Sequence, residues 1–214
     1  MWRMSAGAPS QAGLEITSPA NPRVKRLVAL RQRRARDRAG VTLVAGYEEL
    51  GLALSAGARP RELYVCPALA GSGAQQMIDR VSSLGAEVVR VSRPVFGKIA
   101  YRESPDGWLA VLPAVRTSLA ALEPGTDPLV LICVGVEKPG NLGAILRTAD
   151  AAGATAVIAA DPVADWANPN VVRASKGTVF SVPVASASTA EVFAWLEKHS
   201  LALVAATYRS PPPT

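Results

Sequence analysis

The sequence is poor in the side chains on which metal sites, disulfides and hydrolytic triads are built. Its 214 residues include two cysteines and one histidine. Cys66 and Cys133 lie far apart in apolar stretches, which favours buried thiols over a disulfide or a zinc site. No Gly-x-Ser-x-Gly motif accompanies His199, which we expect at the surface, so a Ser/His/Asp triad has no support. We therefore expect no metal, and chemistry that depends on positioning and a cofactor.

Long hydrophobic runs are also missing. No apolar run approaches membrane-spanning length, and residues 1–14 lack the apolar core of a signal peptide, so we expect a cytoplasmic protein without membrane contact. Hydrophobic residues make up 49% of the chain and charged residues 19%, as in globular proteins. A chain of this length can bury one or two cores.

Positive charge is present in excess and unevenly placed. The net charge is +6, and eight of the 23 basic residues lie between positions 23 and 38, with Asp37 as the single acid among them. Clustered cations bind polyanions by releasing condensed counterions, which predicts a nucleic-acid partner, but a solvated basic helix explains the charge equally well. The basic residues of this cluster are Arg23, Lys25, Arg26, Arg31, Arg33, Arg34, Arg36 and Arg38.

Hydrophobic patterning predicts an α/β protein with two domains. A turn at 18–22 starts a helix that is expected to run to about Arg38, with arginines projecting from its second half. Strands alternate with helices through the rest of residues 16–113, which predicts a small α/β domain with a mainly parallel sheet. The expected strands are 41–45, 61–66, 87–91 and 108–112, and the expected helices are 47–55, 74–84 and 92–99. Residues 114–128 are rich in small and polar residues and are interpreted as a linker with one helical turn near Leu119.

The second domain, residues 129–214, begins with the stretch around which the chain is organised. Residues 129–136 are continuously apolar, which predicts a strand buried on both faces. A turn at Pro139 and Gly140 leads into a helix that we expect to be capped by Asn141 and ended by Gly153. Arg147 points away from the apolar face of this helix and is either an ordinary exposed residue or a ligand-binding one.

Further strands are expected at 154–159, 178–184 and 201–206. Residues 161–172 form a loop after the first of these, at the edge where open α/β sheets bind ligands, and a short helix at 173–177 should follow. Arg173 and Lys176 could hold a phosphate there, or could simply satisfy the carbonyls at the helix end. Ser188 and Glu191 have the spacing of a capping box, which predicts a helix to about Lys198.

The glycines at 140, 143 and 153 do not have the Gly-x-Gly-x-x-Gly spacing, so a dinucleotide site is disfavoured. Instead, two segments resemble the SpoU (TrmH-type) RNA 2′-O-ribose methyltransferases of the SPOUT, or α/β-knot, class. The first is Glu-Lys-Pro-Gly-Asn-Leu-Gly-Ala-Ile-Leu-Arg-Thr-Ala-Asp-Ala-Ala-Gly, residues 137–153, and the second is Val-Arg-Ala-Ser-Lys-Gly-Thr-Val-Phe-Ser-Val-Pro, residues 172–183. Residues 16–113 are similar to the ribosomal protein L30e-like substrate-binding domain of many members, although Ala45 stands where the family usually has Glu.

The resemblance implies methyl transfer from S-adenosylmethionine to a ribose 2′-hydroxyl of structured RNA, most simply ribosomal RNA, by a homodimer. Asn141 and Arg147 match residues that are functionally important in the family. The basic cluster from Arg23 to Arg36, with Arg173 and Lys176, would bind RNA. A guanidinium stays protonated, so Arg147 is better suited to holding a phosphate and stabilising an alkoxide than to acting as a base.

The later motifs of the family have no counterpart before Thr214. The resemblance therefore predicts that the knot-forming part and the cofactor-binding residues would lie C-terminal to Thr214, and that a chain ending there would lack activity. The alternative is a non-catalytic RNA-binding protein, or an inactive methyltransferase fragment without a cofactor site.

Overall fold

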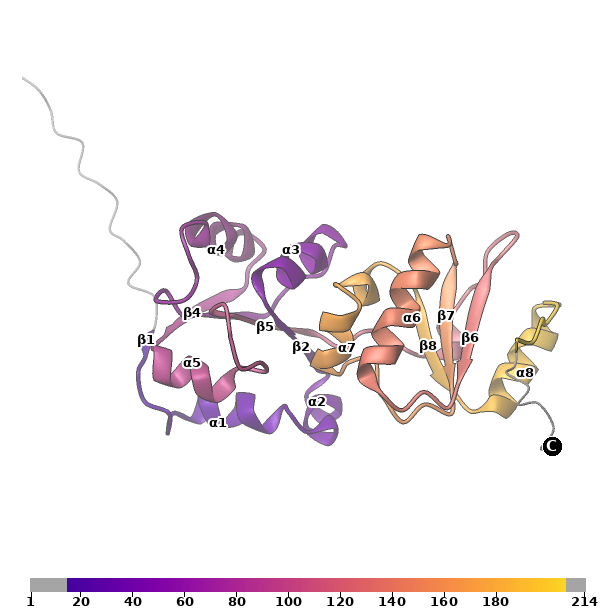
Figure 1. Ribbon diagram of the computed structural model, residues 1–214, viewed down its shortest axis with the longest axis horizontal. Coiled ribbons are helices and arrows are strands. Elements are labelled where there is room, and N and C mark those ends of the chain that lie inside the picture. The colour runs from indigo at the N-terminus through magenta and orange to yellow at the C-terminus, as the bar shows by residue number, and fades with distance from the viewer. Residues whose placement is uncertain (1–14, 207–214) are drawn as a thin grey trace, which may run out of the picture.

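The computed structural model describes residues 15–206 as two α/β units, each built around its own sheet (Figure 1). The N-terminal unit contains β1 to β5 and the C-terminal unit contains β6 to β8. The expectations for residues 1–14 and 207–214 lie outside the described part of the chain. In residues 15–206, no helix has the length and apolar character needed to cross a membrane.

The N-terminal sheet is mixed rather than mainly parallel, so that prediction is wrong in half of its strand pairs. β4 pairs in parallel with β1 and β3, whereas β5 pairs antiparallel with both β3 and β2. The sequence between α5 and β5 forms no helix that could carry the chain across the sheet, and β5 therefore runs back against its neighbours. The strand order is β1 (Glu15–Ile16), β4 (Glu87–Val91), β3 (Glu62–Val65), β5 (Trp108–Pro113) and β2 (Val41–Ala45).

Helices cover both faces of this sheet, with α1 and α5 on one face and α3 and α4 on the other (Figure 1). Their bounds are α1 (Pro22–Ala29), α3 (Tyr47–Ser55), α4 (Ala74–Ser83) and α5 (Arg93–Ile99). The apolar face of α1 buries Val24 and Leu27, as its amphipathic spacing predicts.

The basic segment forms two helices, α1 and α2 (Arg33–Ala39), and not the single predicted helix. The Arg36 side chain donates hydrogen bonds to the carbonyls of Leu30 and Arg31, at 3.1 and 2.9 Å. These carbonyls follow the end of α1, where backbone acceptors have no intrahelical partner. A side chain from α2 thus satisfies acceptors that a continuous helix would have satisfied by itself.

The C-terminal sheet is parallel, with the order β6 (Val130–Val134), β7 (Ala156–Ala160) and β8 (Val184–Ala187). The central strand β7 is fully buried, but β6 is an edge strand on which Leu131 and Val134 are 39% and 66% exposed. The prediction that this strand is buried on both faces is therefore wrong for the described residues. An edge strand has one hydrogen-bonded neighbour, and its apolar composition does not reveal this.

The other elements of this unit are α6 (Pro139–Ala151), α7 (Pro169–Ala174) and α8 (Thr189–Lys198), with 3₁₀ turns at Leu119–Ala121 and Thr178–Phe180. The turn at Leu119 and the Ser188 to Glu191 capping box are confirmed. The expected strand at 178–184 is instead a 3₁₀ turn followed by β8, because Gly177 adopts a left-handed φ of 80° that redirects the chain. Residues 201–206 form no strand; Val204 is 92% exposed and has no packing surface.

The two units share one hydrophobic core. A single cluster of buried side chains includes Leu50 and Trp108 of the N-terminal unit and Leu146, Trp166 and Val172 of the C-terminal unit. The helix α7 packs against β2 across this boundary. Because apolar contact extends from one sheet to the other, the units are fixed relative to each other by burial as well as by polar contacts.

Candidate functional site

The organising helix α6 begins two residues before the predicted cap. Pro139 occupies its first turn and Lys138 is the N-cap residue, so Asn141 lies within the helix and does not cap it. Proline lacks a backbone N–H and has its φ fixed near the helical value, which makes it a favoured first residue. The left-handed Gly153, with φ 74°, lies just beyond the helix end, as predicted.

Asn141 and Arg147 are both exposed on α6. An α-helix rises about 1.5 Å and turns about 100° per residue, so these side chains are separated by about 9 Å along the axis and about 120° around it. Joint action on one atom would require Asn141 to sit in the preceding loop. Because it sits on the helix, the two side chains do not converge on one atom and would contact different parts of a ligand.

Arg147 is fixed by the neighbouring helix α7. Its guanidinium donates a hydrogen bond to the carbonyl of Ala174, the last residue of α7. A cation at this position is favoured by the partial negative charge of a helix C-terminus. The side chain is oriented by this contact but remains solvent-accessible, so its other N–H groups are available to an anion.

The close approach of α6 to α7 depends on Gly143. A Cβ atom at this position would lie 2.6 Å from the Cβ of Ala174 and 2.7 Å from the backbone nitrogen of Ser175. No larger residue fits here without moving α7, and with it the carbonyl that holds Arg147. The sequence hint for this role is a glycine inside an otherwise apolar helix.

Arg173 and Lys176 lie in and just after the last turn of α7, beside the residue that Arg147 contacts, and both are exposed. The ammonium of Lys176 is 3.6 Å from the Glu48 carboxylate of α3. Arg147, Arg173 and Lys176 thus belong to one region at the end of α7. We call these three residues the α7 cation group.

Arg23 and Arg26 of α1 are engaged with carboxylates of the N-terminal sheet. Arg23 lies 2.8 Å from Glu87, and Arg26 pairs with Glu62 and donates to the Tyr64 hydroxyl at 3.2 Å. Burial raises the pKa of Tyr64 to about 12, with a further contribution from Glu62. Burial would also raise the pKa of Glu62, but hydrogen bonds from Tyr64 and Arg26 outweigh it and lower that pKa.

The remaining exposed cations of the basic segment differ in whether they have a protein partner. Arg31 is exposed but donates to the carbonyls of Lys98 and Ala100, at 2.9 and 3.0 Å. Lys25, Arg33 and Arg34 are exposed, and the only ion pair among them in the described structure is a 3.6 Å contact from Arg33 to Asp37. These three are the predicted RNA-binding residues of the segment that remain accessible with at most a weak partner.

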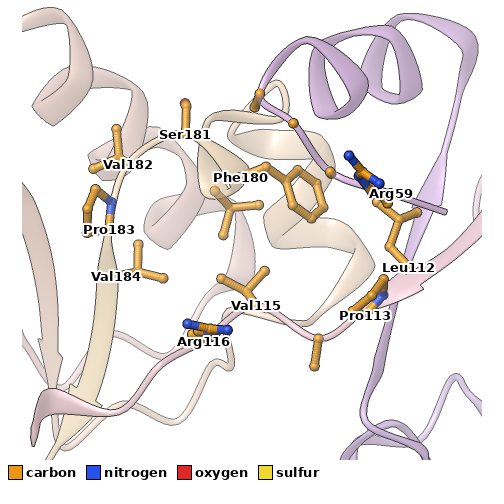
Figure 2. Close-up of a pocket in the computed structure, with 15 residues that line it drawn as sticks. Arg59, Leu112, Pro113, Val115, Arg116, Phe180, Ser181, Val182, Pro183 and Val184 are labelled. Carbon is orange, nitrogen blue, oxygen red and sulfur yellow. The ribbon is translucent and has the colours of Figure 1, made fainter. Parts of the chain in front are cut away.

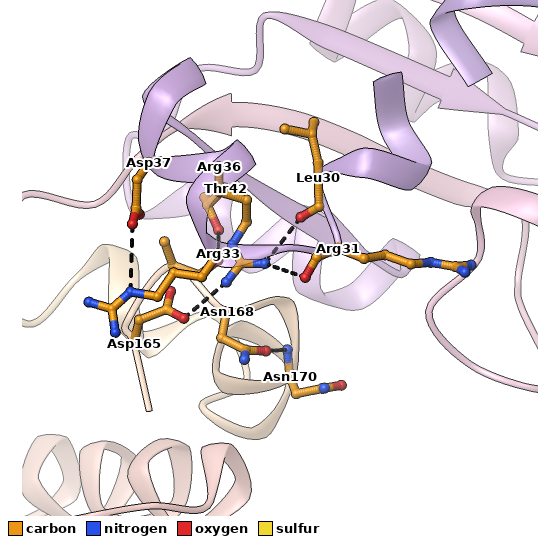
Figure 3. A network of polar contacts seen from close by, with 10 residues as sticks. Leu30, Arg31, Arg33, Arg36, Asp37, Thr42, Asp165, Asn168 and Asn170 are labelled. Atoms are coloured by element: carbon orange, nitrogen blue, oxygen red, sulfur yellow. Dashed lines mark hydrogen bonds and ion pairs between the residues drawn. The ribbon is translucent and has the colours of Figure 1, made fainter. Parts of the chain in front are cut away.

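Arg36 is buried, which contradicts its expected projection from the helix. Its side chain is 2% exposed, and its guanidinium contacts the Asp165 carboxylate at 2.9 Å as well as the end of α1 (Figure 3). Nearby, the Thr42 hydroxyl donates to the carbonyl of Ala167 at 2.8 Å. Both Asp165 and Ala167 belong to the loop after β7, so Arg36 joins the two units and is not available to a nucleic acid. Nothing in the local sequence identifies Asp165 as its partner.

The described residues contain no group of three or more His, Cys, Asp or Glu side chains arranged for a metal ion. His199 follows α8 and packs against Trp195, with ring centroids 4.8 Å apart and the ring planes tilted by 46°. Cys66 is buried and Cys133 is half-buried, both as free thiols.

Comparisons with known proteins agree with both halves of this architecture. Residues 21–110 match the MRM3-like substrate binding domain, and residues 128–214 match the SpoU rRNA Methylase family. A 23S rRNA (uridine(2479)-2′-O)-methyltransferase of Streptomyces viridochromogenes is 32% identical over 197 residues, covering 90% of this chain and 67% of the relative. A 23S rRNA (guanosine(2553)-2′-O)-methyltransferase of Bacillus subtilis is 29% identical, over 79% of this chain and 64% of the relative.

Solved structures give the same result. A crystal structure of an RNA 2′-O ribose methyltransferase superimposes with a TM-score of 0.74 and 38% identity, covering 87% of this chain and 70% of that one. An AdoMet-bound rRNA methyltransferase from Sinorhizobium meliloti gives a TM-score of 0.75 and 31% identity, covering 86% of this chain and 68% of that one.

The fold is therefore that of an RNA methyltransferase with an N-terminal substrate-binding unit. The chain belongs to the SpoU rRNA methylase family. It spans less than two thirds of the first two curated relatives, at 64% and 60% of their lengths.

Proposed function

We propose that the protein is a 2′-O-ribose methyltransferase that acts on ribosomal RNA and uses S-adenosylmethionine. The observation that carries this proposal is the α6–α7 contact, in which a family motif presents an exposed arginine held by a helix-end carbonyl. The relatives described above are named as rRNA methyltransferases, and one structural neighbour has AdoMet bound.

The catalytic residues in this proposal are Arg147 and Asn141. Transfer would form a bond between the ribose 2′-oxygen and the methyl carbon as the carbon–sulfur bond breaks; the sulfur would leave as a neutral thioether and the hydroxyl proton would pass to water. Arg147 stays protonated, so it does not take that proton; it holds a phosphate and stabilises the negative charge that develops on the oxygen. Asn141 lies about two turns away and would contact another part of the nucleotide.

S-adenosylmethionine would supply an electrophilic methyl group on a sulfonium. The described residues fit one side of such a ligand: Val134 at the end of β6 and Val163 just after β7 are each 66% exposed. Exposed apolar side chains at the carboxyl edge of a parallel sheet provide the kind of surface that an adenine ring covers.

RNA binding in this proposal uses Lys25, Arg33 and Arg34 together with the α7 cation group. All are exposed, and counterion release favours their contact with phosphates.

The proposed boundaries are 16–113 for the substrate-binding domain, 114–128 for the linker and 129–214 for the methyltransferase domain. They are supported by the end of β5 at Pro113 and the start of β6 at Val130. A cytoplasmic homodimer completes the proposal, supported by the exposed apolar side chains Leu131 and Phe193.

The experiment that tests the function follows tritiated methyl groups from S-adenosylmethionine to ribosomal RNA. We expect Arg147→Ala to lower the transfer rate roughly 100- to 1,000-fold, as the loss of one pre-positioned donor does in other enzymes. Arg147→Lys should retain part of the activity, since it keeps the charge but not the fork of donors.

The control is Arg80→Ala, which removes an exposed arginine from α4. It should leave the rate unchanged. Full transfer by Arg147→Ala with an intact fold would remove Arg147 from the site. If the unsubstituted protein binds RNA but transfers no methyl group, the result would instead favour the second candidate, a non-catalytic RNA-binding protein. The exposed cations of α2 support that candidate.

A further inference from the structure

A cleft lies between the two units, and none of its lining residues belongs to α6 or α7. Its volume is about 360 Å³. One wall comes from the segment after α3 and includes Arg59, another from the segment after β5 and includes Arg116, and the third comes from residues 179–184 (Figure 2).

The residues that line the cleft are basic or mostly apolar, and none is acidic. The fifteen lining residues include two arginines and no aspartate or glutamate, and most of the others are apolar. Arg59 and Arg116 are exposed, and neither takes part in an ion pair among residues 15–206. In Figure 2 the Phe180 ring points into the cleft, with the two arginines on its walls. An occupant should therefore combine negative charge with a flat apolar surface.

The backbone around Phe180 is held in place, so its ring is well positioned to stack on a planar ligand. It closes the 3₁₀ turn Thr178–Phe180, which follows the left-handed Gly177. A Cβ atom at position 177 would lie 2.9 Å from the Leu52 Cβ, so the turn packs closely on α3. A half-buried ring on a fixed backbone loses little conformational freedom when a planar ligand covers its face.

One wall of the cleft is bonded to the residue that follows the basic helix α2. The helix α2 carries the exposed Arg33, Arg34 and Arg38 and ends at Gly40. The Gly40 carbonyl accepts a hydrogen bond of 3.0 Å from the backbone N–H of Ala114, which lines the cleft. One wall of the cleft is thus joined directly to the end of the basic helix α2.

We propose that this cleft binds an unstacked nucleotide from a single-stranded part of the RNA, with its base against Phe180 and its phosphates held by Arg59 and Arg116. Bases in RNA loops can be splayed out and stacked on aromatic side chains, whereas a duplex is too wide for a cleft of this size. The inference rests on the proposed function, because it assumes an RNA substrate. It adds a second subsite, made of residues other than Asn141 and Arg147, that selects RNA with a loop or bulge.

The test measures equilibrium binding of two RNA probes to the full chain at several salt concentrations. One probe is a hairpin with a large single-stranded loop and the other is a duplex with the same stem sequence. Arg59→Ala with Arg116→Ala should reduce the slope of log affinity against log salt by about 1.4 for the looped probe, at roughly 0.7 per lost single-strand phosphate contact. Binding of the duplex should not change.

Phe180→Leu should weaken binding of the looped probe roughly tenfold without changing the salt slope, since it removes a stacking face but no charge. Phe180→Tyr keeps the ring and should bind like the unsubstituted protein, and thermal unfolding identifies any variant that fails to fold. The matched control, Arg80→Ala with Arg93→Ala, removes two exposed arginines from α4 and α5, at the end of the N-terminal unit remote from the cleft (Figure 1). Its salt slope should stay unchanged.

Equal losses for the duplex, or for the control variant, would show that the cleft is not a nucleotide subsite. Unchanged binding of the looped probe by both cleft variants would overturn the inference while leaving the proposed function intact. Binding of free adenosine monophosphate that depends on Arg59 and Arg116, without any effect on RNA, would assign the cleft to a free nucleotide and would also overturn it. Failure of the unsubstituted protein to bind either RNA would count against the proposed function itself.

Discussion

The basic segment of the N-terminal unit and the α7 cation group use the same side chains in different ways. In the basic segment, Arg23 and Arg26 pair with sheet carboxylates, Arg31 donates to backbone carbonyls, and Arg36 is buried against Asp165. In the α7 cation group, Arg147 has a helix-end carbonyl as its partner and remains exposed. Charge density along the sequence is therefore a poor guide to which cations are available to a ligand.

The difference follows from what surrounds each cation. The basic segment covers a sheet whose neighbouring strands present Glu62 and Glu87, and α2 lies against the loop that carries Asp165. The end of α7 presents carbonyls and one carboxylate, that of Glu48, which is exposed and lies 3.6 Å from the Lys176 ammonium. A cation with a protein carboxylate beside it is already partly neutralised, whereas one beside a carbonyl keeps its full charge for an anion.

The largest effect expected from this comparison is at Arg36. Arg36→Met leaves the Asp165 carboxylate without its cation and should lower the free energy of unfolding by about 3 kcal/mol. Chemical denaturation measures this change. Arg38→Met, an exposed arginine of the same helix, serves as the control and should change stability by less than about 0.5 kcal/mol. Equal losses of stability for the two substitutions would mean that the buried Arg36–Asp165 pair does not stabilise the fold.

A smaller effect, on binding and not on stability, is expected at Arg33 and Arg34. Reversing both charges with Arg33→Glu and Arg34→Glu should weaken RNA binding and reduce the salt slope by about 1.8 for duplex RNA, at roughly 0.9 per phosphate contact. Salt titrations of RNA affinity measure the slope. The control, Arg80→Glu with Arg93→Glu, makes the same change in net charge elsewhere on the N-terminal unit. An identical salt slope for both pairs would mean that the effect comes from net charge and not from contacts between RNA and the basic segment.

The smallest effect is expected at Arg23. Its pair with Glu87 is partly solvent-exposed, at 36% and 48% of the two side chains, so Arg23→Ala should cost less than about 1 kcal/mol of stability. Its effect on the salt slope should be smaller than that of Arg34→Ala, because Glu87 already neutralises part of its charge. A larger slope change at Arg23 would contradict the division of the segment into paired and available cations.

Much of the secondary structure is predictable from local sequence signals. The strands at 41–45 and 87–91 and the helix at 47–55 have the predicted bounds. Gly153 and the Ser188 capping box mark helix ends where expected, because the preference of glycine for positive φ and of serine for caps acts within a few residues. Helical spacing likewise predicts that Arg147 points away from the apolar face of its helix, and its side chain is exposed.

The errors occur where a distant residue decides the outcome. The break between α1 and α2 is stabilised by the Arg36 side chain, whose own position depends on Asp165, 129 residues away. The apolar composition of β6 does not distinguish an edge strand from a central one, since that depends on which strands pair with it. The cleft that contains Phe180 is formed by three segments far apart in the sequence, and only the third belongs to a family motif.

Residue order along the chain was thus sufficient for the α/β alternation, the helix ends and the family motif, because each of these depends on backbone preferences and spacing over a few turns. The tertiary packing decided which arginines are buried, paired or exposed. Desolvation and ion pairing depend on distances between side chains. The N-terminal sheet brings Glu62 and Glu87 to the arginines of α1, and the packing of α7 against β2 and α6 places the partners of Arg36 and Arg147.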